Sequence, residues 1–116
     1  MINSRKLGDC GEDLACRYLE KQGFKILERN KHYSRFCEID IIAQHKDTVV
    51  FVEVKTRRTS DFGSPLEAIT KTKFANIVKG VQYYMSEHNV KNYRIDVVGI
   101  ILKPEVKIEH LKNIHL

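Results

Sequence analysis

The sequence predicts an α/β fold, a mixed β-sheet flanked by helices with its elements in the order α-β-β-β-α-β-β. Apolar residues recur at helical spacing over residues 5–22 and again over 64–88. Two β-branched runs, 39–44 and 48–54, are separated by a single short polar cluster, which is typical of a hairpin. A third apolar run, 94–102, follows the second helix, and a strand-helix-strand order favours parallel pairing.

The first helix is expected to bury one stripe of apolar side chains against the sheet. Its members stand at helical spacing, with Ala15 at the edge of the stripe: Leu7, Cys10, Leu14 and Tyr18. Glu12 lies off this stripe, so that a solvated helix glutamate is one reading of it. Gly23 is placed to cap the carboxyl end of the helix, since glycine adopts the left-handed conformation readily.

A first strand is expected over 24–30, and residues 32–35 are expected to form a loop that leads toward the next strand. We expect this loop to be a plain connection. The alternative is that Tyr33 and Arg35 contact nucleic acid from it.

The hairpin of the two central runs has a register that the turn decides. A two-residue loop at Lys46 and Asp47 pairs His45 with Thr48, and a four-residue loop gives the same register. Counting outward then places Asp40 opposite Glu53, with Cβ atoms about 4.5–5.5 Å apart. Lys55 follows Glu53 by two residues and therefore points to the same face.

Three charged residues in otherwise apolar strands, Asp40, Glu53 and Lys55, need an explanation. Two carboxylates directly opposite one another destabilise a sheet unless a cation lies between them. Mg²⁺ is commonly held by one or two carboxylates together with phosphate and water, and a lysine beside it can orient water or neutralise developing charge. The competing interpretation is a partly exposed ion-pair cluster with no catalytic role.

The segment after Lys55 is polar and basic, and Arg57 and Arg58 are placed there to contact phosphates. The alternative is a mobile surface loop. Ser64 followed by proline, with Glu67 three residues after it, predicts a helix start with a capping box. Thr70 or Thr72 is a point at which this helix could divide. The sequence also predicts a short edge strand over 106–110.

The second helix carries its own buried stripe and three lysines that are expected to be exposed. The stripe is Ile69, Phe74, Ile77, Val78 and Val81, with Tyr84 or Met85. The lysines are Lys71, Lys73 and Lys79.

Composition sets the broad class. A chain of 116 residues with 42% hydrophobic residues predicts one domain, residues 1–116. The net charge of +5 is a mild preference for polyanions. We expect no membrane segment and no signal peptide. Three cysteines without a CxxC spacing favour reduced thiols, and hence a cytoplasmic protein.

Asp40, followed on the next strand by Glu53, Val54 and Lys55, resembles the PD-(D/E)xK signature of restriction-endonuclease-like nucleases. More narrowly, the chain resembles the YraN-like family of small, uncharacterised bacterial proteins, whose fold is similar to that of archaeal Holliday-junction resolvases. The matching blocks are Gly11-Glu12, Gly23-Phe24, Arg29-Asn30, Glu38-Ile39-Asp40, the run 51–57, Phe62-Gly63, Lys73 and the run 94–98. Where the family usually has glycine before Glu-Ile-Asp, this sequence has Cys37.

The resemblance implies a single endonuclease-like domain that cleaves DNA, including branched DNA, with Mg²⁺ or Mn²⁺. By this analogy Asp40, Glu53 and the carbonyl of Val54 hold the metal, and Lys55 acts on water or charge. Glu12 would be an auxiliary carboxylate, and Lys73 would face the substrate. The alternative is a non-catalytic protein that binds nucleic acid or a partner on a nuclease scaffold. The DNA structure that is cut and the oligomeric state, a homodimer included, stay open.

Overall fold

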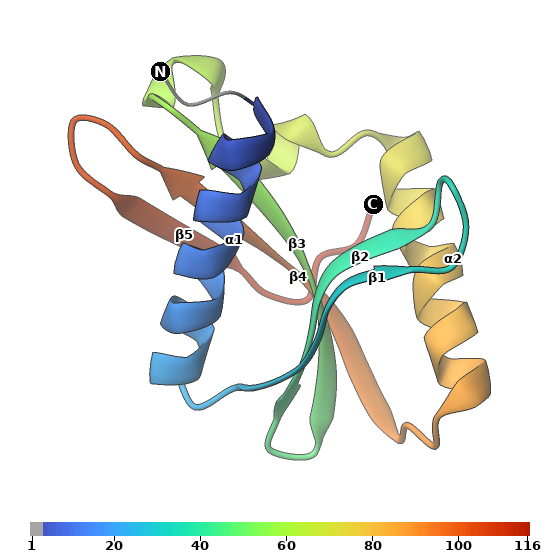
Figure 1. Ribbon diagram of the computed structural model, residues 1–116. Coiled ribbons are helices and arrows are strands. Elements are labelled where there is room, and N and C mark those ends of the chain that lie inside the picture. Colours follow the sequence, from blue (N-terminus) through green and yellow to red (C-terminus); the bar gives the residue numbers. More distant parts are fainter. Residues whose placement is uncertain (1–3) are drawn as a thin grey trace.

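The computed structural model describes residues 4–116, and its elements follow the predicted order (Figure 1). The helices and strands are α1 (Ser4–Lys21), β1 (Lys25–His32), β2 (Glu38–His45), β3 (Thr48–Arg57), α2 (Lys71–Glu87), β4 (Asn92–Ile101) and β5 (Lys107–Leu111). Two short 3₁₀ turns, Ser60–Phe62 and Pro65–Ala68, lie between β3 and α2. The α/β class and the order α-β-β-β-α-β-β are therefore confirmed.

The strands form one five-stranded sheet in the order β1-β2-β3-β4-β5. Neighbouring strands are antiparallel except β3 and β4, which are parallel and are connected through α2. Helix α1 lies on one face of the sheet and α2 on the other (Figure 1). The sheet is thus mixed, as predicted, and its three inner strands, β2, β3 and β4, contribute buried residues on both faces.

The predicted register of the β2–β3 hairpin is confirmed over five pairs, from His45 opposite Thr48 to Ile41 opposite Val52. The turn has two residues, and Lys46 adopts a positive φ of 55° in it. A tight turn of this kind requires the left-handed conformation, and its length sets which side chains share a face.

Each face of the sheet has its own hydrophobic core. On the α1 side the buried residues are Ala15, Cys16, Leu19, Phe24, Ile41, Ala43, Val50, Val52, Val98 and Ile100. On the α2 side they are Ile39, Ile42, Val49, Phe51, Ile77, Val81, Tyr84 and Ile95. Alternating residues of β3 therefore face opposite cores. The nearly uniform apolar sequence of this strand reflects burial on both faces, and its one buried charge, Glu53, points to a single face.

The predicted buried stripe of α1 is confirmed only in part: Leu14 and Tyr18 pack against the core on that side of the sheet. Cys10 is exposed and Leu14 is only partly buried, whereas Ala15, Cys16 and Leu19 are buried. The helix is rotated because it approaches β3 closely at Gly11: a Cβ on this residue would lie 1.8 Å from Thr56 Oγ1. Only glycine permits this contact, and it turns the side of the helix that carries Glu12 toward the sheet. Among residues 4–116, no helix is long and apolar enough to cross a membrane.

The predicted start of the second helix also needs correction. Ser64 forms no side-chain cap, so the capping box is absent, and the residues after it form only the short turn Pro65–Ala68. Helix α2 begins at Lys71, with Thr70 as its cap; the Thr70 hydroxyl accepts a hydrogen bond from the main-chain N–H of Lys73. Division of the segment at Thr70 is therefore confirmed. Strand β3 also continues to Arg57, three residues beyond the predicted end, because it pairs with β4 along its whole length.

A buried polar network around Asp96 fastens the end of the chain to the sheet. Asp96 is fully buried and accepts hydrogen bonds from His110 Nε2 (2.7 Å), the Asn113 main-chain N–H (2.9 Å) and Arg94 Nε (3.0 Å). The Tyr18 hydroxyl shares a further hydrogen bond with His110 Nδ1 at 2.9 Å. Burial by itself would raise the pKa of Asp96, but the hydrogen bonds from His110 and Asn113 outweigh it and hold that pKa below its usual value.

Candidate active site

The alternation of side chains along β2 breaks at Asp40. Ile41 packs in the α1-side core and Ile39 in the α2-side core, although residues two apart in a regular strand share a face. On β1, Arg29 pairs with Ile41 and Lys31 with Ile39, and Asn30 between them has a positive φ of 52°. In both strands the regular alternation of side chains between the two faces of the sheet is therefore interrupted at this point.

The break places the Asp40 carboxylate between β2 and β3. The paired residues of these strands end at Ile41 and Val52, so the predicted direct pairing of Asp40 with Glu53 is not part of the ladder. Instead, Asp40 Oδ2 accepts a hydrogen bond of 2.8 Å from the main-chain N–H of Val54. The side chain takes the place of a ladder hydrogen bond where the two strands separate, which fixes the carboxylate close to Glu53.

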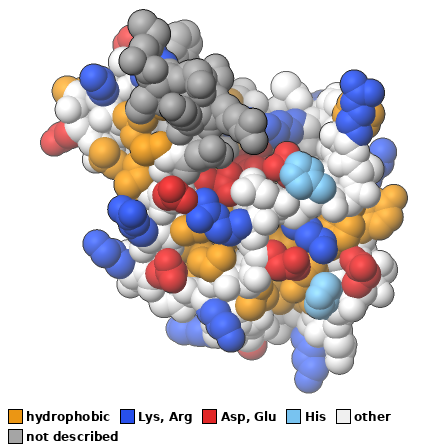
Figure 2. All heavy atoms as spheres, viewed as in Figure 1, with side chains coloured by type: hydrophobic (Ala, Val, Ile, Leu, Met, Phe, Trp, Pro, Cys, Tyr) orange, Lys and Arg blue, Asp and Glu red, His pale blue; other side chains and the backbone are white. Residues whose placement is uncertain are grey.

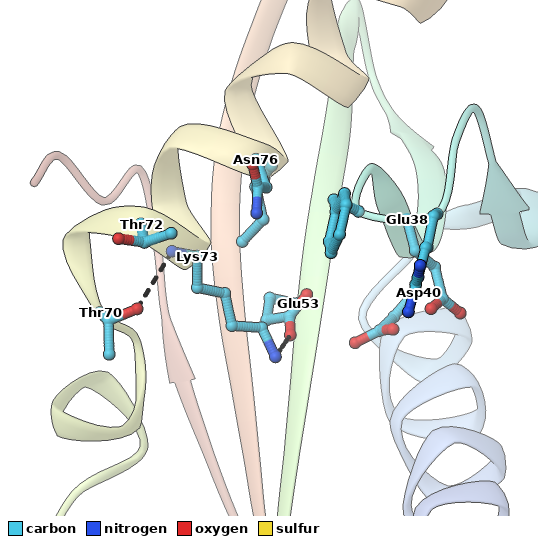
Figure 3. Close-up of a pocket in the computed structure, with 10 residues that line it drawn as sticks. Glu38, Asp40, Glu53, Thr70, Thr72, Lys73 and Asn76 are labelled. Atoms are coloured by element: carbon cyan, nitrogen blue, oxygen red, sulfur yellow. Dashed lines mark hydrogen bonds and ion pairs between the residues drawn. The ribbon is translucent and has the colours of Figure 1, made fainter.

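Glu53 is buried in the middle of β3, at 5% exposure, and two lysines approach the same carboxylate oxygen. Lys73 Nζ lies 2.9 Å and Lys55 Nζ 3.6 Å from Glu53 Oε1. Figure 3 shows Lys73 reaching from the start of α2 to Glu53 on β3. The Lys73 side chain is 40% exposed, as expected, but it is also ion-paired, because the cap at Thr70 starts α2 where the first-turn lysine reaches the carboxylate.

The charges of this cluster shift one another's ionisation. Burial, and then the negative charge of Glu53, raise the pKa of Asp40 to about 8 against the opposing effect of the Val54 N–H. Burial, and then the neighbouring Lys73, lower the pKa of Lys55. Burial also acts to lower the pKa of Lys73, but its contacts with Lys55 and Glu53 outweigh it and the pKa is raised. The carboxylate pair therefore resists carrying two negative charges.

Asp40 lines a pocket on each of its two sides. The first pocket, of about 380 Å³, lies between β2 and the start of α2 and includes Glu53 and Lys73. Figure 3 shows Glu38 and Asp40 on one wall, Thr70, Thr72 and Asn76 on the opposite wall, and Glu53 between them. The second pocket, of about 370 Å³, lies beside α1. Asp40 is the one residue that the linings of these two pockets share.

The second pocket contains three more of the residues singled out in the sequence. Glu12, Lys55 and Arg57 line it together with Asp40 and Val54. The solvated interpretation of Glu12 is wrong, since the residue is only 8% exposed and its Oε1 lies 3.5 Å from Arg29 Nε. It is close enough to contribute to the raised pKa of Asp40.

The described residues contain no ready-made metal cage: none of their His, Cys, Asp and Glu side chains gather in threes or more around a common point. The donors that do come together are the carboxylates of Asp40 and Glu53, and the main chain of Val54, which follows Glu53, is hydrogen-bonded to Asp40. A donor set of this size fits Mg²⁺, which typically retains several waters and completes its shell with substrate phosphate.

The two arginines lie at different distances from this cluster. Arg57 is the last residue of β3, paired with Ile101 of β4, and lines the second pocket. Arg58 is exposed beyond the strand, and its carbonyl accepts a hydrogen bond of 2.8 Å from the Lys103 N–H. The start of the predicted loop is therefore held against β4.

Phe36 and Asn76 also line the first pocket, and neither was predicted to belong to the site. Phe36 lies in the β1–β2 loop and lines the first pocket together with Arg35, yet its side chain is 68% exposed. The signal available in the sequence was a lone aromatic next to an arginine, four residues before Asp40. Asn76 stands one helical turn after Lys73 and so shares its side of α2, a relation that follows from spacing once the true helix start is known.

Comparison with known proteins gives one consistent match. Residues 11–100 match the family described as "Uncharacterised protein family UPF0102". The UPF0102 protein TTE1452 of Caldanaerobacter subterraneus is 42% identical over 118 residues, covering 97% of this chain and 96% of its own. UPF0102 proteins of Syntrophomonas wolfei and Caldicellulosiruptor saccharolyticus are 44% and 45% identical, covering 95% and 97% of this chain and 97% and 98% of their own.

Proposed function

This chain belongs to the uncharacterised protein family UPF0102, and we propose that it is a metal-dependent nuclease that hydrolyses phosphodiester bonds in DNA. One observation carries the proposal: two carboxylates and two lysines meet where β2 and β3 separate, with a pocket on each side. The resemblance of Asp40, Glu53 and Lys55 to the PD-(D/E)xK signature supports the same reading.

Asp40, Glu53 and the Val54 carbonyl would hold Mg²⁺ or Mn²⁺. The residues fit such an ion because burial, and then the charge of Glu53, raise the pKa of Asp40 and disfavour its ionised form, which a cation would offset, and because Glu53 Oε1 already attracts two ammonium groups. When bound, the cation lowers the pKa of a coordinated water and polarises a phosphoryl oxygen. Glu12 lies one layer further out, held by Arg29.

Lys55 would act on the reacting groups. Its lowered pKa and its position 3.6 Å from Glu53 suit an ammonium that donates a hydrogen bond to water or to the phosphate oxygen that gains charge. Lys73 would transfer part of its contact from Glu53 to a substrate phosphate, since its side chain lines the same pocket. Arg57 and Arg58 would hold phosphates on the other side of Asp40.

A second candidate function, non-catalytic binding of nucleic acid or of a protein partner, is favoured by one contact. Lys73 lies 2.9 Å from Glu53, and together with Lys55 it already balances the carboxylate without a metal. In that case the cluster would be an ion-pair network with no catalytic role. Turnover distinguishes the two functions: purified protein is incubated with branched, single-stranded and duplex DNA in Mg²⁺ or Mn²⁺, and only the nuclease produces metal-dependent fragments.

We expect DNA binding to weaken steeply with salt, because lysine and arginine contacts to phosphate release counterions. Figure 2 shows basic side chains mixed with acidic ones on the face that it draws, without a broad basic patch, so the contacts should be few and local. Arg57→Glu should weaken binding to all sequences alike and reduce the salt slope by about 1. Arg17→Glu, which makes the same charge change on an exposed position of α1, is the control.

Fluorescence anisotropy over a range of salt concentrations measures both the affinity for DNA and its dependence on salt. Equal losses of affinity in Arg57→Glu and Arg17→Glu would show that only net charge matters, and would remove Arg57 from the site. Absence of binding to any DNA at low salt would contradict both candidate functions.

A further inference from the structure

The loop between β1 and β2 is fixed by its own main chain and by α2. The Tyr33 N–H donates to the Cys37 carbonyl at 2.9 Å, and the Cys37 N–H donates to the Ser34 carbonyl at 3.3 Å. The Tyr33 ring stacks on Tyr83 of α2 with centroids 5.3 Å apart. Cys37 is buried, and its φ lies outside the positive range, so the backbone there does not need the glycine usual in the YraN-like family.

Phe36 projects from this fixed loop into solvent. At 68% it is the most exposed large hydrophobic side chain among the residues whose burial the structure describes. The Arg35 guanidinium lies 5.5 Å from the centre of its ring, and both residues line the pocket that contains Asp40, Glu53 and Lys73. An exposed aromatic ring at the mouth of a charged pocket is an open stacking surface.

The charges around the ring decide which occupant fits. A protein partner would be expected to cover a broad apolar patch, whereas here the ring lines a charged pocket in which Arg35 and Lys73 are the cations and Glu38, Asp40 and Glu53 the carboxylates. Single-stranded nucleic acid is bound by this combination, in which an aromatic side chain stacks on a base and nearby cations hold its phosphates. A base inside a duplex is already stacked on both faces and cannot accept the ring.

We propose that Phe36 stacks on an unpaired base of bound DNA, so that the substrate class is DNA with a single-stranded segment beside the cut. The proposal rests on the proposed function and deepens it. Phe36 precedes Asp40 by four residues, a span of at most about 14 Å, so the stacked base belongs within a few nucleotides of the scissile phosphate.

The chain contains no tryptophan, so a Phe36→Trp variant carries a unique fluorescent reporter at the stacking position. It is made in a Lys55→Met background, which keeps both carboxylates and under the proposed function leaves the DNA uncut, and is titrated with single-stranded oligothymidylate in Mn²⁺. We expect quenching of the tryptophan as bases stack on it. Tyr93→Trp, at a half-exposed aromatic position of β4 opposite Val49, is the matched control and should stay unquenched.

Affinity gives the second readout. Phe36→Ala should weaken binding of single-stranded DNA by about 5-fold to 150-fold, the range for loss of one base–aromatic stack, and leave fully paired duplex unchanged. Bound oligothymidylate without quenching, or equal losses for both DNA forms, would overturn the stacking role while the nuclease proposal stands on its cleavage assay. Absence of binding and of cleavage by the unmodified chain would overturn the proposed function itself.

Discussion

Asp40→Asn, Glu53→Gln and Lys55→Met are each expected to reduce metal-dependent DNA cleavage by at least about 100-fold, with the fold retained. The first two remove a charge from the pair that would hold the cation, and the third removes the ammonium 3.6 Å from Glu53. Loss of one group aimed at developing charge commonly costs 10²–10³ in rate, which sets this order of magnitude. Single-turnover cleavage with protein in excess is the measurement.

Matched controls separate this effect from a general loss of charge. Glu109→Gln and Lys107→Met make the same chemical changes on exposed positions of β5 and should cleave at the rate of the unmodified chain. Circular dichroism of every variant checks the fold. Cleavage by Asp40→Asn at the unmodified rate would indicate a contaminating nuclease and would remove the activity from this chain.

Without metal, Asp40→Asn is expected to stabilise the protein at pH 8, whereas most point substitutions destabilise by roughly 1 kcal/mol. The folded state raises the pKa of Asp40 from 3.8 to about 8, so between these values it binds more protons than the unfolded state. Its stability therefore falls as pH rises from about 4 through about 8. The fall is on the order of a few kcal/mol, and the asparagine, which can still accept from the Val54 N–H, should remove it.

Denaturant unfolding in EDTA from pH 5 to pH 8.5 measures this difference. Asp47→Asn, at an exposed position in the hairpin turn, makes the same substitution and should keep the pH dependence of the unmodified chain. A destabilised Asp40→Asn at pH 8 would mean that Lys55 and Lys73 depend on Asp40 as a partner. The cluster would then be structural.

Local patterns were enough to predict the hairpin. The polar residues of the turn and the period of two in the strands define its register, and these features lie within twenty residues of one another. The break at Asp40 could not be predicted in this way, because it depends on Asn30 of another strand and on two cores that select opposite faces. The same interruption gives Asp40 its hydrogen bond to Val54.

Helix faces and long-range ion pairs were the weaker part of the prediction. The buried side of α1 depends on a contact between Gly11 and Thr56, and spacing within the helix carries no information about it. The ion pair of Lys73 with Glu53 was not predicted, since the helix start was placed six residues too early, at Pro65 instead of Lys71. Asp96 was read only as part of a buried strand, since its partner His110 stands in a different strand.

Thermal unfolding of the unmodified chain and of Asp40→Asn, each in EDTA and in Mn²⁺, tests the cation site most directly, because it needs no knowledge of the substrate. At tenfold excess over the dissociation constant, binding stabilises the unmodified chain by roughly 1.4 kcal/mol, a rise in melting temperature of about 4–8 °C. Asp40→Asn should lose most of this rise and, in EDTA, melt no lower than the unmodified chain. An unmodified chain that does not shift in several millimolar Mn²⁺, beside a destabilised Asp40→Asn, would contradict the proposed metal site.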